Sequence, residues 1–400
     1  MPLRLSDSPD SSSALPTAGG EGKWLAEPGY GVYVHVPFCR HRCHYCDFNT
    51  YEGLDPLHGA YVDALEREIG EAEHDGPPAT SVFFGGGTPT LLAPDALARL
   101  LGAVRGSIGV APGAEVTIEA NPETVDERTF AGLLDAGFNR FSIGVQSLAP
   151  HVLQRLGRTH SAEPALEALA AARRAGAADV NADLIFGSPW EGPDDWRRSL
   201  DGIVASGTTH VSAYALTVEE GTPLATLITT GREPDVDPDV QAERHAIASD
   251  VLGAVGFARY EVSNWAQPGR ASRHNVLYWS AGDYAGFGAG AHGHASGRRF
   301  WRTRLPRDYI EAVGRGLSTE AGSETLTPEQ RAREAMTLGL RLVSGVEEDA
   351  FYGRFPAARS EIGAIAGALC AEGWLVREDG WLRVSSAGTF VANDILCRFL

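Results

Sequence analysis

The hydrophobic positions of this chain follow two alternating patterns over about 190 residues that begin at Gly31. Short runs rich in β-branched and aromatic residues, typical of strands, alternate with stretches whose apolar positions recur every three or four residues, as in amphipathic helices. Several helical stretches end at glycine. This repeat predicts a parallel sheet with right-handed crossovers, either a partial barrel or an open doubly wound sheet. The six expected strands are residues 31–37, 81–87, 115–122, 140–147, 179–187 and 210–217.

The repeat is lost after a segment rich in Pro and Asp at 233–240. From Thr327 we expect helix, turn, helix, two alternating strands joined at Asp379 and Gly380, and a last helix, an order that resembles a small winged-helix module. The fold class is therefore α/β, followed by an α+β segment and this C-terminal module. The expected units are a flexible tail at 1–28, the βα repeat at 29–234, the α+β segment at 235–325 and the winged-helix-like module at 326–400.

Charge and lysine content exclude several classes of function. The chain has 34 Lys and Arg against 52 Asp and Glu, a formal net charge of −18, so we expect no nucleic acid partner. Its single lysine, Lys23, lies in the expected tail, which argues against Schiff-base, pyridoxal and P-loop enzymes. No run approaches the roughly 20 apolar residues of a membrane-spanning helix, so no stable membrane insertion is expected.

The cysteines indicate a reducing, cytoplasmic setting. There are five, an odd number, and three of them stand within eight positions, which suits a disulfide framework poorly. The tail lacks the apolar core of an export signal. Cys370 and Cys397, remote from the other three, are expected to be buried apolar thiols.

Cys39, Cys43 and Cys46 directly follow the first expected strand and bring three thiolates to one point at its carboxyl end. A [4Fe–4S] cluster needs four ligands, so three cysteines leave one iron open to bind another group. The alternative is a zinc-stabilised binding protein without redox function. Its fourth zinc ligand would come from His35, His41, His44 or Asp47.

The segment YVHVPFCRHRCHYCDF at 33–48 resembles the cluster loop of the radical S-adenosylmethionine (SAM) family. It is most similar to the branch that contains oxygen-independent coproporphyrinogen III dehydrogenases and haem chaperones. The resemblance implies a partial (β/α)6 barrel that holds a [4Fe–4S] cluster on the three cysteines. It also implies that the open iron chelates SAM, which one electron can cleave to a 5′-deoxyadenosyl radical. Whether SAM is cleaved in this protein's task stays open, and so does its classification as an enzyme.

Polar residues at the expected strand ends mark where SAM would bind, because parallel α/β folds place their sites at the carboxyl ends of strands. A Gly-Gly-Gly-Thr-Pro run at 85–89 ends the second strand, and its glycines allow close backbone approach to a ligand. Acidic side chains there would suit a cationic sulfonium. By resemblance, the SAM contacts are Tyr33, Gly86, Gly87, Thr88, Glu119, Gln146, Arg158 and Asp183.

Two features favour the haem chaperones over the dehydrogenases. The dehydrogenase branch has a further cysteine two residues after the third, where this chain has Phe48. The segment HNVLYW at 274–279 matches the HNxxYW signature of the haem-chaperone branch. Histidine is a common axial ligand of haem iron, and Tyr278 and Trp279 offer flat faces to a porphyrin, so His274 is the expected haem-binding residue. A hydrogen-bonded core histidine is the alternative.

Other residues near this segment could assist. A glycine-rich run at 288–293 fits the G-x-G-x-x-G pattern, but without a clean strand and helix around it we expect a loop over the cofactor site. His292 and His294 are expected accessory ligands. The one dense basic group could pair with porphyrin propionates or form a solvated face. It comprises Arg298, Arg299, Arg302, Arg304 and Arg307.

The resemblance implies that the protein binds haem and passes it to apo-haemoproteins, including membrane-bound respiratory proteins. It also implies an electron donor, which the sequence does not identify. The alternative function is oxidative decarboxylation of coproporphyrinogen III to protoporphyrinogen IX, on the same fold.

Overall fold

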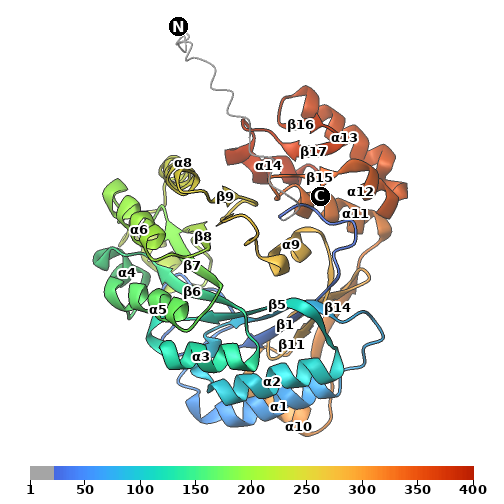
Figure 1. The fold of residues 1–400 in the computed structure, drawn as a ribbon. Helices are drawn as coiled ribbons and strands as arrows, with labels where there is room; N and C mark the ends of the chain where they lie inside the picture. The colour runs from blue at the N-terminus through green and yellow to red at the C-terminus, as the bar shows by residue number, and fades with distance from the viewer. Residues whose placement is uncertain (1–21) are drawn as a thin grey trace.

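The computed structural model describes residues 22–400, so most of the expected tail, residues 1–21, lies outside the described residues. Six parallel strands in the order β1-β4-β5-β6-β7-β8 form the expected partial barrel (Figure 1). All six predicted strands are confirmed, although the third begins at Val110, before its expected start. The strands are β1 (Tyr30–Val36), β4 (Ala79–Gly86), β5 (Val110–Ala120), β6 (Arg140–Gln146), β7 (Asp179–Phe186) and β8 (His210–Ala215).

Amphipathic helices cover the outside of these strands (Figure 1). Helix α3, for example, starts where the Asp126 carboxylate accepts a hydrogen bond from the Thr129 amide at 2.7 Å, and it ends at Gly137, whose φ is +102°. Its apolar side buries Phe130 and Leu133. The helices of this part are α1 (His58–Gly70), α2 (Pro94–Ser107), α3 (Glu127–Ala136), α4 (Pro150–Leu156), α5 (Ala162–Arg174), α6 (Pro193–Ala205), α7 (Pro223–Thr229) and α8 (Pro238–Ala254).

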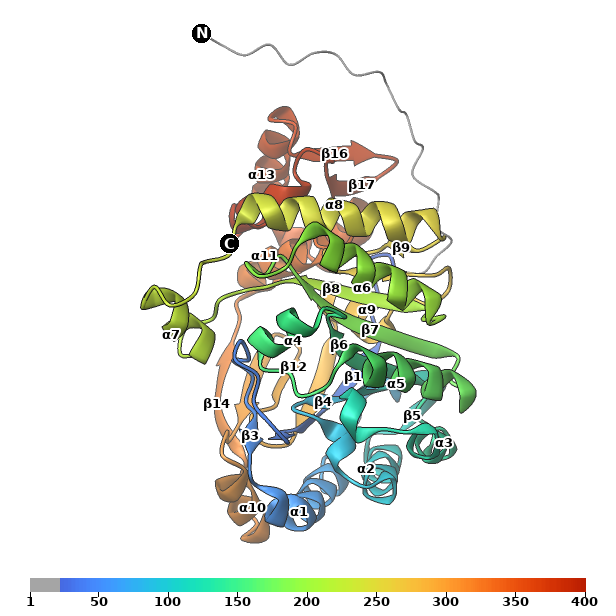
Figure 2. The same ribbon diagram turned by 90° about the vertical axis from the view of Figure 1, so that its left-hand side faces the viewer.

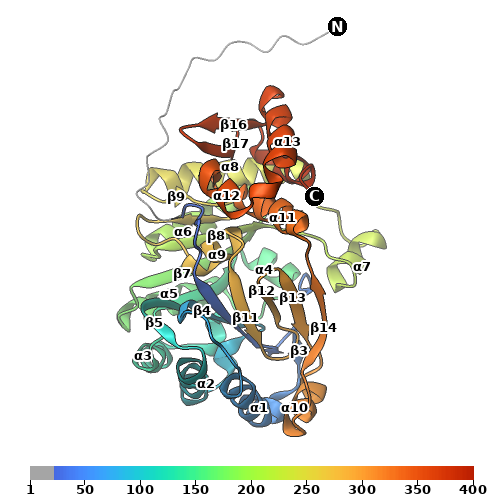
Figure 3. The same ribbon diagram turned by 90° about the vertical axis from the view of Figure 1, so that its right-hand side faces the viewer.

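The segment expected at 235–325 extends the barrel sheet at both edges. Strand β10 pairs antiparallel with β8, whereas β11 pairs parallel with β1 and leads into an antiparallel run to β14 (Figure 3). Helix α9 packs against β1 and β4, and α10 packs against α1. These elements are β9 (Ala258–Arg259), β10 (Asn264–Ala266), α9 (Arg273–Trp279), β11 (Asp283–Phe287), β12 (His292–Ala295), β13 (Arg298–Arg302), α10 (Pro306–Gly314) and β14 (Glu320–Thr325).

The C-terminal module has its own apolar core and lies beyond α8 (Figure 2). Its strands order as β15-β17-β16, and the predicted hairpin turn is confirmed because Asp379 and Gly380 adopt φ of +50° and +83°. Cys370 packs partly against this core, but Cys397 is exposed, so its prediction as a buried thiol is wrong. The elements are α11 (Pro328–Gly339), β15 (Val346–Glu347), α12 (Glu348–Arg354), α13 (Arg359–Ala371), β16 (Leu375–Glu378), β17 (Trp381–Val384) and α14 (Ala392–Cys397).

Several shorter elements complete the described chain. The cluster loop carries a two-stranded pairing of β2 with β3, and five 3₁₀ helices lie within residues 22–400. None of the helices in this described part has the length and apolar character that crossing a membrane requires. The elements are β2 (Phe38–Cys39), β3 (Tyr51–Glu52), η1 (Asp55–Leu57), η2 (Pro89–Leu91), η3 (Pro122–Thr124), η4 (Pro356–Ala358) and η5 (Thr389–Val391).

The end of the expected tail is anchored, so the prediction of a flexible tail is wrong for these residues. Trp24 is only 4% exposed and lies in the core of the C-terminal module, with its ring centroid 6.1 Å from that of Phe351. Lys23 places its ammonium 5.6 Å from the Trp381 ring, and the Leu25 amide donates to Ser280 Oγ at 3.0 Å. The chain therefore enters the barrel from a fixed point on the C-terminal module.

Replacing Trp24 should destabilise the C-terminal module. Truncation of a buried aromatic side chain costs about 3 kcal/mol, because both transfer energy and packing are lost. Trp24→Ala should therefore lower the free energy of unfolding by about this amount in denaturant titrations, whereas Glu27→Ala at an exposed neighbouring position should change it little. Equal stability of the two variants would contradict the anchoring role.

Candidate functional site

The three cysteines lie on a loop that leaves β1 and folds back on itself. Strand β2 pairs in parallel with β3, and the Tyr51 amide donates to the Pro37 carbonyl at 2.7 Å, which closes the loop. Within it, the Cys46 amide donates to the Cys43 carbonyl at 3.3 Å. The loop stands at the carboxyl end of β1, the end predicted from the sequence to hold the site.

Each thiol lies beside a hydrogen-bonding side chain. Thr88 Oγ1 lies 3.8 Å from Cys39 Sγ, and Arg158 Nη1 lies 3.4 Å from Cys43 Sγ. Burial raises the pKa of Cys39 to about 11 and also raises the pKa of Cys46. Without a metal, Cys39 and Cys46 therefore hold their protons, and donors such as Thr88 and Arg158 suit the thiolates that a metal cluster would create. The donor set therefore fits an iron–sulfur cluster.

One of the candidate zinc ligands, His35, is engaged elsewhere through both ring nitrogens, which weighs against its part in the zinc alternative. His35 Nδ1 lies 2.8 Å from Tyr33 Oη and its Nε2 lies 3.0 Å from the Asn49 carbonyl, while His44 Nδ1 lies 3.1 Å from the Arg155 carbonyl. Within residues 22–400, no three Cys, His, Asp or Glu side chains converge as ligands of a single ion. The cysteines of a [4Fe–4S] cluster bind different irons, so their sulfurs stand apart.

The glycine run at the end of β4 lies directly against the cluster loop. A Cβ on Gly86, whose φ is +113°, would stand 2.3 Å from the His35 ring, and a Cβ on Gly87 would stand 2.5 Å from the Phe38 carbonyl oxygen. The Thr88 amide donates to the same Phe38 carbonyl at 2.7 Å. Only glycine allows this approach, so the run that sequence analysis assigned to SAM also holds the cysteine loop in place.

Two carboxyl groups, Glu119 on β5 and Asp183 on β7, flank β6 and lie close enough for the charge of Asp183 to act on Glu119. Glu119 Oε2 accepts a hydrogen bond from the Gly86 amide at 3.0 Å, and Asp183 is hydrogen bonded to Ser142 at 2.9 Å and to Asn181 at 2.8 Å. Burial, followed by the charge of Asp183, raises the pKa of Glu119 to about 8. Burial raises the pKa of Asp183 to about 6. A cationic ligand between them would favour ionisation of both.

Arg158 links the cluster loop to the strand ends. Its Nη2 donates to Asn121 Oδ1 at 2.7 Å and to the Gly144 carbonyl at 2.9 Å, while its buried Nε has no hydrogen-bond partner among the described residues. Gln146 lies beside the same Gly144 and adopts a φ of +66°, a strained value outside glycine. Sequence analysis missed Asn121, which also donates to Thr88 Oγ1 at 2.9 Å and follows Glu119 at the same strand end.

His274 lies at the other end of the barrel. Its Nδ1 is 2.9 Å from the hydroxyl of Ser81, near the beginning of β4, whereas Gly86 lies at the end of that strand. The side chain is 1% exposed, its Nε2 is buried without a hydrogen-bond partner, and burial lowers its pKa to about 3. A Phe83 ring stacks between Tyr33 at 6.2 Å and His274 at 5.2 Å, and so connects the two ends of the barrel.

The first turn of α9 fixes the position of His274. Ser272 caps the helix by accepting a hydrogen bond from the Asn275 amide at 3.3 Å. The buried Glu115 carboxylate accepts from the amides of Arg273 and His274, both at 3.0 Å, which suits the partial positive charge of a helix start. The helix places His274 and Tyr278 on one face, with ring centroids 4.6 Å apart.

The glycine-rich run at 288–293 connects β11 to β12, and no helix begins there. A Cβ on Gly290 would stand 2.2 Å from Asn49 Nδ2, so this loop packs against the cluster loop. Three arginines of the basic group are paired with glutamates in the described structure, which leaves them less available to propionates. The ion pairs are Arg298 with Glu320, Arg299 with Glu324 and Glu334, and Arg302 with Glu68.

The raised pKa of Glu119 predicts a specific pH dependence of stability. Protonated Glu119 favours folding, and this contribution is lost as the pH rises from about 4.5 through about 8. Between pH 6 and pH 9 the wild-type protein should therefore lose about 1 kcal/mol more unfolding free energy than Glu119→Gln, a value reduced for solvent screening at this partly exposed site. Denaturant titrations at both pH values measure the difference, and parallel losses would contradict it.

Comparisons with known proteins agree with this geometry. Residues 33–202 match the Radical SAM superfamily, which implies a [4Fe–4S] cluster and SAM, and residues 326–391 match the HemN C-terminal domain. The protein "Heme chaperone HemW" of Mycobacterium tuberculosis is 41% identical over 376 residues, covering 93% of this chain and 95% of the relative. The protein of the same name from Bacillus subtilis is 32% identical, covering 92% and 98%.

Among solved structures, coproporphyrinogen III oxidase (HemN) from Escherichia coli superposes with a TM-score of 0.79. The match covers 94% of this chain and 91% of HemN, at 20% identity. At that identity the likeness shows a shared fold, whereas the similarity to the chaperones extends through the cysteine loop, the barrel and the C-terminal module. The chain therefore belongs to the HemW family of the radical SAM superfamily.

Proposed function

We propose that this protein is a haem chaperone of the radical SAM type, which binds a [4Fe–4S] cluster, SAM and haem and passes haem to apo-haemoproteins. The observation that carries the proposal is the similarity to proteins named heme chaperone, at up to 41% identity over 93% of the chain. Phe48 supports the same choice, because it stands where the dehydrogenase branch has its further cysteine. Its side chain is 64% exposed beside the cluster loop.

The cluster would be held by Cys39, Cys43 and Cys46, with one iron left for SAM. When reduced, it supplies an electron to the sulfonium of SAM. Arg158 Nη1 lies 3.4 Å from Cys43 Sγ and would donate to that sulfur when it binds the cluster. Thr88 has a corresponding position beside Cys39.

The residues around this loop have the chemistry that SAM requires. Glu119 and Asp183 would ionise beside the cationic ligand and bind its charged groups. Gly86 and Gly87 have no side chain to fill the space beside these two carboxyl groups. A side chain at either glycine would collide with the cluster loop. Tyr33, Gln146 and Arg158 complete the proposed SAM contacts.

Haem would be handled at the opposite end of the barrel by α9. His274 carries the feature expected of an unused ligand, a buried Nε2 without a hydrogen-bond partner among the described residues. The contact of its ring with Tyr278 means that a porphyrin reaches His274 only when α9 shifts or Tyr278 turns away. Haem binding would then replace an unsatisfied polar atom by an iron–nitrogen bond.

The recipients would be apo-haemoproteins in the cytoplasm or at the membrane, including respiratory proteins, and a separate donor would supply electrons to the cluster. The second candidate function is that of an oxygen-independent coproporphyrinogen III dehydrogenase, which the HemN-like fold favours. Both functions use the same cluster and the same barrel, so the product of the reaction must decide between them.

Anaerobic reconstitution tests the cluster and the function together. Wild-type protein should bind about four irons and four sulfides, and Cys43→Ser should lose most of both, whereas the control Cys397→Ser should retain them. With reductant, SAM and coproporphyrinogen III, no vinyl-containing product should form. Protoporphyrinogen IX as product would contradict the chaperone function, and colourless protein with stoichiometric zinc would contradict the cluster.

His274→Ala should weaken haem binding about tenfold, equivalent to about 1.4 kcal/mol, and shift the Soret band, because an axial nitrogen is lost. His151→Ala, at an exposed position on α4, is the matched control and should titrate like the wild type. A thermal unfolding curve checks that the buried substitution leaves the fold intact. An unchanged Soret band and affinity in folded His274→Ala would contradict this role.

A further inference from the structure

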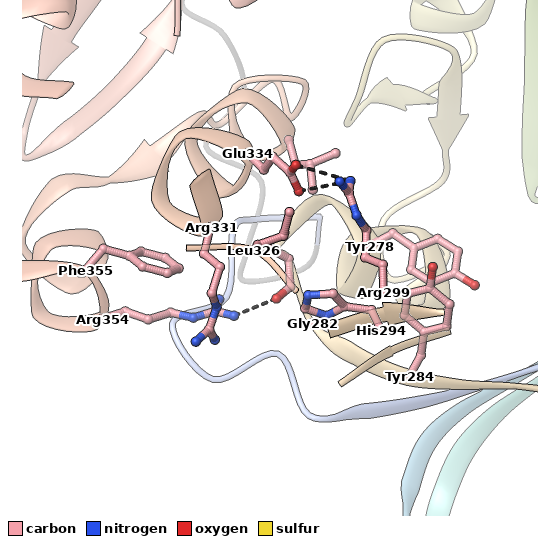
Figure 4. Close-up of a pocket in the computed structure, with 12 residues that line it drawn as sticks. Tyr278, Gly282, Tyr284, His294, Arg299, Leu326, Arg331, Glu334, Arg354 and Phe355 are labelled. Atoms are coloured by element: carbon pink, nitrogen blue, oxygen red, sulfur yellow. Dashed lines mark hydrogen bonds and ion pairs between the residues drawn. The ribbon is translucent and has the colours of Figure 1, made fainter. Parts of the chain in front are cut away.

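A cavity of about 220 Å3 lies between strands β11 to β13 and the C-terminal module, outside the cluster site (Figure 4). Strands β11 and β12 and the end of α9 form one wall, and α11 and α12 form the other. The cavity therefore joins the helix that carries His274 to the module that follows it. The residues that matter here are Tyr278, Tyr284 and His294 on the first wall and Arg331, Arg354 and Phe355 on the second.

Two guanidinium groups that form no ion pair among the described residues face this cavity, although the charge of Asp283 acts on both from farther away. Arg354 donates to the Ser280 carbonyl at 2.7 Å and to the Ala281 carbonyl at 2.5 Å. Burial lowers the pKa of Arg354, the charge of Asp283 raises it to a smaller extent, and the charge of the neighbouring Arg331 lowers it. No ion pair within residues 22–400 neutralises either group, unlike Arg299, which is paired with two glutamates. Adjacent like charges in a half-enclosed space suit a ligand with carboxylates.

His294 on the same cavity has the arrangement of a metal-binding histidine. Its Nδ1 lies 2.9 Å from the Asp283 carboxylate, which also accepts a hydrogen bond from the Ser296 amide at 3.0 Å. A carboxylate on one ring nitrogen fixes the ring orientation and makes the other nitrogen a better ligand. The Nε2 atom of His294 is therefore available to a metal.

Aromatic rings connect His294 to the proposed haem ligand on α9. The Tyr284 ring stacks on His294 with centroids 6.5 Å apart and meets Tyr278 at 4.6 Å, and Tyr278 in turn contacts His274 at 4.6 Å. These flat rings form the surface between the two histidines. A planar aromatic ligand could pack on them in the same way that they pack on one another.

We propose that this cavity receives the propionate edge of haem, with Arg331 and Arg354 binding the carboxylates and His294 supplying an imidazole to the iron. The inference rests on the proposed function and names the subsite that serves it. The walls of the cavity carry an imidazole that suits iron, tyrosine rings that suit a flat apolar ring, and two guanidinium groups that suit carboxylates. The cavity is smaller than the 300–1,000 Å3 of typical ligand pockets, so one edge of the porphyrin enters and the rest lies against the tyrosines.

Three porphyrins separate the contributions of these groups. Arg331→Gln should lower the affinity for haemin and for iron-free protoporphyrin IX about tenfold, but leave haemin dimethyl ester unchanged because its carboxylates are blocked. His294→Ala should lower the affinity for haemin about tenfold and shift its Soret band, but leave protoporphyrin IX unchanged because it has no iron. Arg315→Gln, at an exposed arginine at the end of α10, is the control. Affinities come from Soret and fluorescence titrations.

The outcomes distinguish this inference from the proposed function. Wild-type protein that binds no haemin would contradict the proposed function itself. Wild-type protein that binds haemin, with Arg331→Gln and His294→Ala titrating identically to it, would leave the function standing and overturn the subsite. Equal weakening of all three porphyrins by Arg331→Gln would also overturn it, since the effect would then be independent of the carboxylates. The Arg331 guanidinium has no ion-pair partner in the described structure, so this variant should fold normally.

Discussion

The close contact between the end of β4 and the cysteine loop is the constraint on which the rest of the site depends. Gly86 and Gly87 lie against His35 and Phe38 at distances that no side chain would allow. This contact fixes where the loop stands relative to the barrel, and Thr88 then reaches both the loop backbone and a cysteine. A side chain at Gly86 or Gly87 would push the cysteine loop away, so both glycines are needed to keep the thiols in this position.

From that contact the electrostatics of the barrel follow. The Gly86 amide also donates to Glu119, on which the charge of Asp183 acts. At the carboxyl end of the barrel, two carboxyl groups whose pKa values are raised by burial therefore lie near the cysteine loop, where Arg158 Nη1 stands 3.4 Å from Cys43 Sγ. The amino end holds the buried His274, whose pKa is lowered to about 3, and Arg331 and Arg354 lie farther out. The proposed SAM site and the proposed carboxylate subsite therefore lie at opposite ends of one scaffold.

Much of this could be predicted from the sequence, because the signals are local. Each strand of the barrel is a short apolar run, and the turn at Asp379 and Gly380 is set by two adjacent residues. Strand-end polarity drew attention to Glu119 and Asp183, and the structure brings them close enough for the charge of Asp183 to act on Glu119, although Asp183 lies within β7 and not at its end. Asn121 follows the end of the same strand, but an amide is a weaker signal than a carboxylate, and its contacts with Thr88 and Arg158 become visible only in the structure.

Other features depend on contacts between distant parts of the chain, which the hydrophobic periodicity of the sequence does not predict. The sequence around Trp24 predicts a flexible tail, and Trp24 is buried only because it packs in the core of the C-terminal module. Strand β11 joins β1 and so makes the 235–325 segment a continuation of the barrel sheet. The pairing of the arginines on β13 with glutamates, and the unpaired state of Arg331 and Arg354, likewise follow from tertiary packing.

The most direct test of the central claim is electron paramagnetic resonance of the reduced, reconstituted protein with and without SAM. Addition of SAM should change the g values of the cluster signal, because the ligand binds the open iron. In Gly87→Val, whose side chain would displace the cysteine loop, SAM should no longer change them. Identical spectra of the wild-type protein in both conditions would contradict the account.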